Sequence, residues 1–184
     1  MTADTASSVA LPAKRVAGLF LCVVLLCVGL IWAWLSMRAV MGVGGSCASG
    51  GPYEIATPCP DGSWLIALAI PMLIITAMVG SGLAIGLSAP NLLIPMWFLL
   101  FASLGWNFLE YGFFHGEPSV SYIVCGVLFE LMALPALFLV PVGLRSKPPR
   151  PDGAAPVWFW VVSYAGLASV GISLGAWTYV LVST

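Results

Sequence analysis

Long runs of apolar residues alternate with short polar breaks along this chain of 184 residues. The runs are approximately Val16–Met37, Trp64–Leu87, Leu92–Phe114, Ser121–Leu144 and Val157–Val182. About 20 apolar residues are enough for a helix to cross the hydrocarbon core of a bilayer. A helix satisfies its backbone hydrogen bonds internally, as lipid requires, and the alternation typical of a transmembrane strand is missing from the sequence. The pattern predicts an all-α, polytopic transmembrane bundle of five helices.

The breaks between the runs differ in character. Residues 39–63 are rich in Gly and Pro, which favours tight turns, and we expect them to form an external loop. Residues 145–156 read RSKPPRPDGAAP and are expected to be a cytoplasmic, polyproline-like hinge or, alternatively, a proline-rich ligand for a partner domain. Residues 1–15 are expected to form a disordered cytoplasmic tail, and residues 16–184 a single transmembrane domain.

Composition supports lipid as the solvent. Hydrophobic residues make up 61% of the chain and charged residues only 7%, whereas roughly a quarter of the residues in soluble domains are charged. The net charge is -1, and the six Lys and Arg are scattered. The chain therefore offers no basic face for nucleic acid, and we expect none as a partner.

The positive charges predict the orientation. Five helices place one group of basic residues on the same side of the membrane: Lys14, Arg15, Arg145, Lys147 and Arg150. Arg38 alone falls on the other side, whereas four helices would split the group. The positive-inside rule then puts the N-terminus in the cytoplasm and the C-terminus outside. Because the first run is longer than the apolar core of a secretory signal, we expect it to be a retained helix.

Two of the five cysteines, Cys47 and Cys59, bracket the predicted external loop. Disulfides persist outside the cytoplasm, so this pair is expected to be bonded. The other three lie within apolar runs, where cysteine behaves as a small hydrophobe. The spacing does not fit a C-x-x-C redox centre, and the single histidine, His115, is far along the chain. We therefore predict no metal and no cofactor.

The external loop also carries a resemblance. The stretch Cys47-Ala-Ser-Gly-Gly-Pro-Tyr-Glu, followed by Pro58-Cys59-Pro60-Asp61-Gly62, resembles a motif of small polytopic membrane proteins of actinobacteria, a family with no assigned activity. The resemblance covers this loop and the general helix layout, and it implies no catalytic role. The loop is expected to cap the outer mouth of the bundle, although Tyr53 and Glu54 offer an alternative as a binding surface.

Several polar residues fall inside the runs or at their outer ends, and they form the candidate intramembrane site: Arg38, Asn107, Glu110, His115 and Glu130. An acid within a membrane span is costly and is therefore a functional candidate. One interpretation is structural, with Glu130 protonated and Asn107 joining helices. A second is a proton or cation site formed by Asn107 and both glutamates, with Arg38 as an outer counter-charge. A third, an acid–base pair of an enzyme assisted by His115, lacks any accompanying catalytic motif.

Small residues predict where helices pack. Gly82 and Gly86 in the second run, and Gly171 and Gly175 in the fifth, form GxxxG patterns that permit close helix contact. We therefore expect a non-enzymatic accessory or scaffold subunit, with the lipid bilayer and other membrane subunits or its own copies as partners. The alternative is a small transporter or channel component that handles a cation at Glu110 and Glu130.

Overall fold

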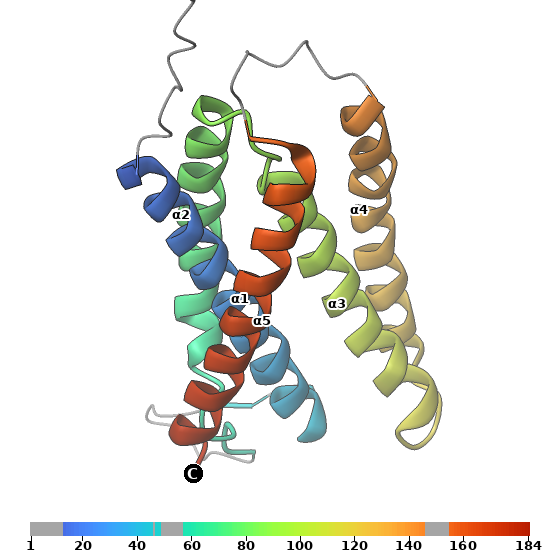
Figure 1. The fold of residues 1–184 in the computed structure, drawn as a ribbon. Helices are drawn as coiled ribbons and strands as arrows, with labels where there is room; N and C mark the ends of the chain where they lie inside the picture. The colour runs from blue at the N-terminus through green and yellow to red at the C-terminus, as the bar shows by residue number, and fades with distance from the viewer. Residues whose placement is uncertain (1–12, 46, 49–56, 146–154) are drawn as a thin grey trace, which may run out of the picture.

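The chain folds into five helices, seen as a ribbon in Figure 1. The computed structural model describes residues 13–45, 47–48, 57–145 and 155–184, with residues 140–145 represented by their backbone. The helices are α1 (Ala13–Gly42), α2 (Leu65–Gly86), α3 (Leu93–Phe114), α4 (Val120–Arg145) and α5 (Val157–Val182). Each is long and apolar enough to cross a membrane. The predicted all-α, five-helix fold is confirmed, and α2 to α5 begin and end within one residue of the expected bounds.

Only α1 departs from its expected bounds by more than one residue. It begins at Ala13, so Lys14 and Arg15 are helical and do not belong to a tail. It also continues past the expected loop start at residue 39 as far as Gly42. Ala39, Val40 and Met41 are therefore helical residues and do not belong to the loop. Gly44 and Gly45 then end it with φ angles of +99° and +79°, and the Gly45 amide donates to the Val40 carbonyl at 3.0 Å. At 30 residues α1 measures about 45 Å, long enough to cross the bilayer with a tilt.

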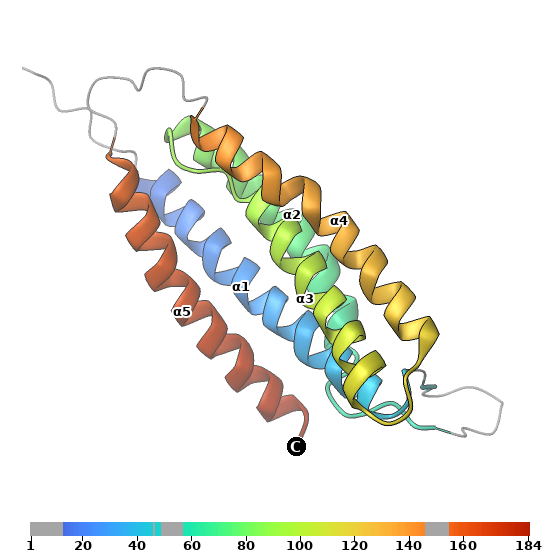
Figure 2. The ribbon, with the colours of Figure 1, turned by 90° about the vertical axis from the view of Figure 1, so that its right-hand side faces the viewer.

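Successive helices run in opposite directions, which gives the bundle two distinct ends. The start of α1 and the α2–α3 turn lie at one end, whereas the C-terminus and the α3–α4 turn lie at the other (Figures 1 and 2). We call the first the basic end, because the start of α1 carries Lys14 and Arg15. The opposite one, where Cys47 and Cys59 lie, is the disulfide end.

α1 is the central helix. It packs extensively against α2 and α5 and, over a shorter length, against α3. Leu19, Leu73 and Ala77 are fully or almost fully buried in the core between α1 and α2. The main contact of α4 is with α3, and that of α5 is with α1. The bundle thus consists of a compact α1–α2–α5 group and an α3–α4 hairpin joined to it mainly through α1.

The two glycine patterns behave differently. A Cβ on Gly171 would lie 2.7 Å from the Val24 carbonyl oxygen, and one on Gly175 would lie 3.1 Å from the Val28 Cα, so both glycines touch α1. Gly82, in contrast, has nothing within 4 Å of its Cβ position. Around Gly86 the nearest atom is a side-chain nitrogen of Arg15 at 3.6 Å.

Among the described residues, the α2 pattern therefore makes no close backbone contact with another helix. The contact of α2 with α1 is made through Gly80, where a Cβ would lie 3.1 Å from the Cys22 Cβ. Positions 80 and 82 are about 200° apart on a helix, so the face that contacts α1 excludes Gly82. The expectation that Gly82 and Gly86 permit close helix contact therefore stays a prediction, and such a contact would be with a helix other than those described here.

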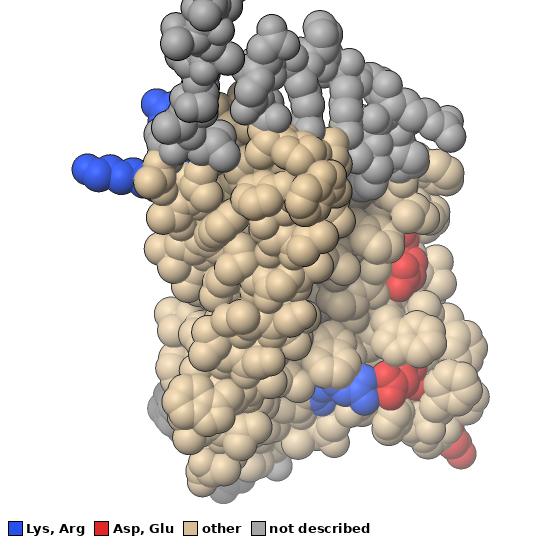
Figure 3. All heavy atoms as spheres, viewed as in Figure 1, with Lys and Arg blue, Asp and Glu red and all other residues tan. Residues whose placement is uncertain are grey.

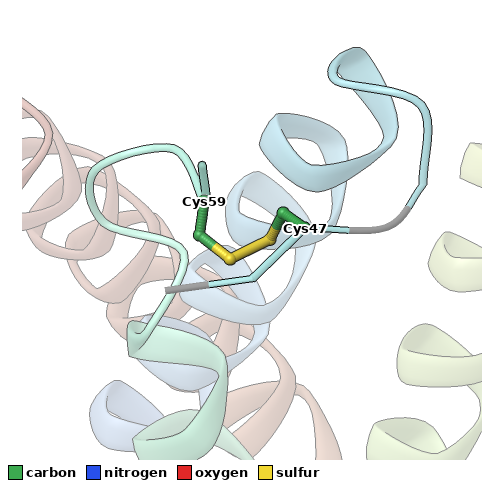
Figure 4. Close-up of a disulfide and its surroundings, with 2 residues drawn as sticks. All are labelled: Cys47 and Cys59. Atoms are coloured by element: carbon green, nitrogen blue, oxygen red, sulfur yellow. A yellow bond between two sulfur atoms is a disulfide. The ribbon is translucent and has the colours of Figure 1, made fainter. Parts of the chain in front are cut away.

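At the disulfide end, Cys47 and Cys59 are bonded to each other, as predicted (Figure 4). Beside the bond, the Ala48 amide donates to the Thr57 carbonyl at 3.0 Å. The Ser36 hydroxyl of α1 donates to the Gly62 carbonyl at 3.2 Å and anchors the loop to the bundle. Tyr53 and Glu54 lie outside the described residues.

Candidate functional site

An ion pair joins Arg38 of α1 to Glu110 of α3 near the disulfide end. Arg38 Nη1 lies 2.6 Å from Glu110 Oε2, and Nη2 donates to Oε1 at 2.9 Å. The side chains are only 27% and 22% exposed. Two parallel charged hydrogen bonds fix the guanidinium and the carboxylate in one plane and are stronger than a single bond. The pair therefore ties the α3–α4 hairpin to the central helix.

Asn107 of α3 is fully buried and is a third member of the network around Arg38. Its Oδ1 accepts a hydrogen bond from Arg38 Nη1 at 3.2 Å, and its Nδ2 donates to the Trp34 carbonyl oxygen at 3.5 Å. Residues three apart on a helix share a face, which explains why Asn107 and Glu110 reach the same part of α1. Both ends of the amide thus have partners, as a polar group buried in a membrane requires.

Aromatic rings enclose the guanidinium. Arg38 Cζ lies 5.0 Å from the ring centroid of Trp34 and 5.7 Å from that of Tyr111, within the range of cation–π attraction. The Tyr111 hydroxyl also donates to the Arg38 carbonyl at 3.4 Å. We call Trp34, Arg38, Asn107, Glu110 and Tyr111 the Arg38 cluster.

His115 lies at the rim of this cluster. Its ring stacks on Tyr111 at a centroid distance of 4.1 Å, and its Nδ1 lies 3.5 Å from the Glu110 carbonyl oxygen. The imidazole is exposed, and its contact with Glu110 is to the backbone carbonyl. Its position suits support of Tyr111 better than proton transfer with Glu110.

The Arg38 cluster lies near the ends of its helices and not at the centre of the membrane. Arg38 and Glu110 are each four residues from the end of their helix, about 6 Å along the axis. A charge pair at this depth can still reach the interfacial region, and its cost is far below that of a pair at the bilayer centre. The cluster is thus placed where an intramembrane ion pair is tolerated.

Glu130 of α4 does not join the Arg38 cluster. Its carboxyl lies beside Gly105 of α3, where a Cβ would be only 2.7 Å from Glu130 Oε1. Gly105 precedes Glu110 by five residues, so Glu130 lies about 7.5 Å farther from the disulfide end. Among the described residues its carboxyl has no hydrogen-bond or ion-pair partner. The two acids therefore do not form one site in this structure.

Three glycines at the α3–α4 contact were missed in the sequence, and one of them, Gly105, lies beside Glu130. Gly105 and Gly112 of α3 and Gly126 of α4 lie where the two helices approach each other closely, and a Cβ on Gly126 would be 3.0 Å from the Gly105 carbonyl oxygen. Gly105 and Gly112 are seven residues apart and so share one face of α3. A search for glycines at a spacing of seven, beside the GxxxG spacing, would have found this contact.

An apolar groove of about 570 Å³ lies on the α3–α4 hairpin toward the basic end, and Leu93, Trp97, Met132 and Pro135 are among its lining residues. The Trp97 indole donates to the Met132 carbonyl at 3.0 Å. Proline lacks the amide that would bond the preceding turn of its helix, and Trp97 supplies a donor to that same turn. The groove has the character of a lipid-facing packing defect.

The chemistry open to these residues is limited. Both carboxylate oxygens of Glu110 accept hydrogen bonds from Arg38. An external cation would therefore have to displace the bidentate guanidinium. Within the described part of the chain, no three His, Cys, Asp or Glu side chains gather as a metal site would require. Of the two intramembrane acids, Glu130 is the one that remains available.

Comparison of the chain with protein-family models, with curated proteins and with solved structures finds no match in any of the three. The resemblance of the outer loop to actinobacterial membrane proteins stays a prediction. Function has to be inferred from the Arg38 cluster, from Glu130 and from the surfaces that the helices leave uncovered.

Proposed function

We propose that this chain is a non-enzymatic accessory or scaffold subunit that packs against other membrane subunits or against its own copies. The carrying observation is that small-residue positions on two helices have no close neighbour in the described part of the chain. Gly82 has an open Cβ position on α2, and on α5 Gly166 is exposed with nothing within 4 Å. In lipid, close packing of such faces drives helix association.

The degree of burial supports the same proposal. Within the apolar stretch of each helix that could cross the membrane, 39% of the residues of α1 are buried, against 17% for α4 and 11% for α5. On α5 the exposed hydroxyls of Ser169 and Ser173 donate to the carbonyls of Ala165 and Ser169 in their own helix. Such faces suit a neighbouring helix as well as lipid.

In this proposal the Arg38 cluster has a structural role. It holds the α3–α4 hairpin on α1, because Arg38 satisfies Glu110 and Asn107 together. The outer surface of the hairpin thereby keeps a fixed position relative to α5. A scaffold needs this kind of fixed spacing between its docking faces.

We further propose that the basic end faces the cytoplasm. Lys14 and Arg15 lie there, and Arg145, at the end of α4, lies at the same end. The side chain of Arg145 and the residues Lys147 and Arg150 lie outside what the structure describes. The positive-inside rule supports this orientation and puts the Cys47–Cys59 loop outside.

The test is extraction of the tagged chain from its native membrane in mild detergent, followed by native mass spectrometry. We expect a complex with further membrane subunits or a defined homo-oligomer. A monodisperse monomer with no co-purifying protein, in several detergents and after crosslinking in the membrane, would count decisively against the proposal.

One observation favours a second candidate, a small transporter or channel component: Glu130 is an acid without a partner among the described residues. This candidate uses Glu130 alone, because Glu110 is bound to Arg38. It expects Glu130→Gln to abolish cation or proton flux in proteoliposomes without loss of folding. Unchanged flux in that variant would remove this candidate.

A further inference from the structure

Glu130 is placed deep in the membrane. It is ten residues from the start of α4 at Val120 and fifteen from its end at Arg145, about 15 Å and 22 Å along the axis. Its side chain is only half-buried, and its carboxyl has no partner among the described residues. An unpaired acid at this depth is unfavourable in free energy, and a charged or hydrogen-bonding partner would stabilise it.

The hairpin is built to hold this carboxyl in place. Gly105 leaves the space that the carboxyl fills, because a Cβ there would be 2.9 Å from Glu130 Cγ and 2.7 Å from Oε1. The preceding residue, Phe129, stacks with Phe101 and Phe108 at centroid distances of 6.0 and 5.5 Å. Residue 130 is rotated by about 100° from residue 129, so the carboxyl lies at the other edge of the α3–α4 contact.

The molecule is hollowed next to this hairpin. Figure 3 shows a recess between α5 and the α3–α4 hairpin, with acidic side chains on the hairpin side. α5 packs extensively on α1 but not on α3 or α4, so the recess separates two helical walls. A recess bounded by helices along the membrane normal has the shape of a groove for another helix.

We infer that the recess between α5 and the α3–α4 hairpin receives a transmembrane helix of a partner, and that Glu130 binds a basic residue at the middle of that helix. This inference rests on the proposed function and names the chemistry of the partner. Charge complementarity carries it. Of the basic side chains that the structure describes, Arg38 is bound to Glu110, and Lys14 and Arg15 lie at the basic end.

A helix fits this position better than a lipid does. Phospholipid headgroups stay at the interface, whereas Glu130 is about 15 Å from the nearer end of its helix. A Lys or Arg at mid-span is carried to that depth by the helix that bears it. The same residue would be costly in lipid alone, which makes the docked state favourable for both partners.

The test uses the full chain in nanodiscs and a synthetic polyleucine transmembrane peptide with one Lys at mid-span. The same peptide with Leu at that position is the control, and binding is measured by energy transfer between labels. We expect the Lys peptide to bind the wild-type chain and the Glu130→Gln variant to bind it roughly tenfold more weakly. Glu117→Gln, which changes an exposed acid in the α3–α4 turn, should bind it as the wild type does.

Equal binding of the Lys peptide to the wild type and to Glu130→Gln overturns the inference, and so does equal binding of the Lys and Leu peptides. Binding of tetraphenylphosphonium that depends on Glu130, without peptide binding, overturns it in favour of a small-cation site. If Glu130→Gln does not fold, Glu130→Asp withdraws the charge by one methylene, and it should bind the Lys peptide more weakly than the wild type does.

The native complex separates this inference from the proposed function. If the wild-type chain co-purifies with a partner that Glu130→Gln retains in full, the helix-docking inference fails while the accessory role stands. If the wild type is a monomer without a partner, the accessory role fails whatever the peptide does.

Discussion

At the scale of single residues, the Arg38–Glu110 pair is the contact whose loss should lower stability most. Each partner is mostly buried, so removal of one leaves the other without its charged hydrogen bonds. We expect Arg38→Gln or Glu110→Gln to lower the free energy of unfolding by about 1.5–3 kcal/mol. The measurement is reversible unfolding of the purified chain in bicelles.

Coupling within the pair provides a stricter check. The double variant Arg38→Gln/Glu110→Gln should lower the free energy of unfolding by clearly less than the sum of the two single variants. The reason is that neither charge is then left unpaired. Glu117→Gln, at an exposed acid outside the cluster, is the matched control and should change little. Strict additivity of the two single variants would show that the pair contributes nothing to stability.

Three residues of this cluster, Arg38, Asn107 and Glu110, could be found in the sequence, but their contacts and the two aromatic members could not. The spacing of Asn107 and Glu110 places them on one face, and the predicted topology brings Arg38 to the same end. Glu130 was grouped with them because both acids belong to the outer half of the predicted spans. Which way α4 turns Glu130 depends on its contact with Gly105, and the hydropathy of a uniformly apolar helix carries no information on that rotation.

At the scale of helices, the contact of α5 with α1 depends on Gly171. A methyl group there would approach the backbone carbonyl oxygen of Val24 to 2.7 Å, and backbone cannot move aside as a side chain can. We expect Gly171→Ala to lower the free energy of unfolding by about 1–3 kcal/mol through overpacking. Gly166→Ala on the same helix meets nothing within 4 Å and should be neutral or slightly stabilising, since Ala favours helix.

Unfolding of both variants in the same bicelles decides the matter. Equal losses for Gly171→Ala and Gly166→Ala would contradict the prediction, because a position with no neighbour within 4 Å would then be as sensitive as the α1–α5 contact. Helix bounds followed closely from the apolar runs, because lipid imposes length and internal hydrogen bonding on each span. Which helices contact each other did not follow from the sequence. The GxxxG patterns of α2 and α5 look alike in the sequence, and only the structure shows which of them faces another helix.

At the scale of the whole molecule, the Cys47–Cys59 bond holds the loop between α1 and α2 closed. The bonded residues are 12 apart in sequence, and closure of a loop of this size stabilises a fold by about 3 kcal/mol. We expect Cys47→Ser to lower the free energy of unfolding by up to this amount. Cys125→Ser, at a free and exposed cysteine of α4, is the control and should leave stability unchanged.

The two ends of the bundle make the orientation of the molecule a testable consequence of its charges. In a variant with Cys22, Cys27 and Cys125 replaced by Ala, single cysteines at Glu117 and Thr184 report on the disulfide end, and Thr2→Cys reports on the N-terminus. If the basic end faces the cytoplasm, a membrane-impermeant maleimide should label Glu117→Cys and Thr184→Cys in intact cells, and Thr2→Cys only after the membrane is permeabilised. Labelling in the reverse pattern would place the Cys47–Cys59 bond in the reducing compartment, where disulfides rarely persist, and would contradict both the orientation and the role assigned to the closed loop.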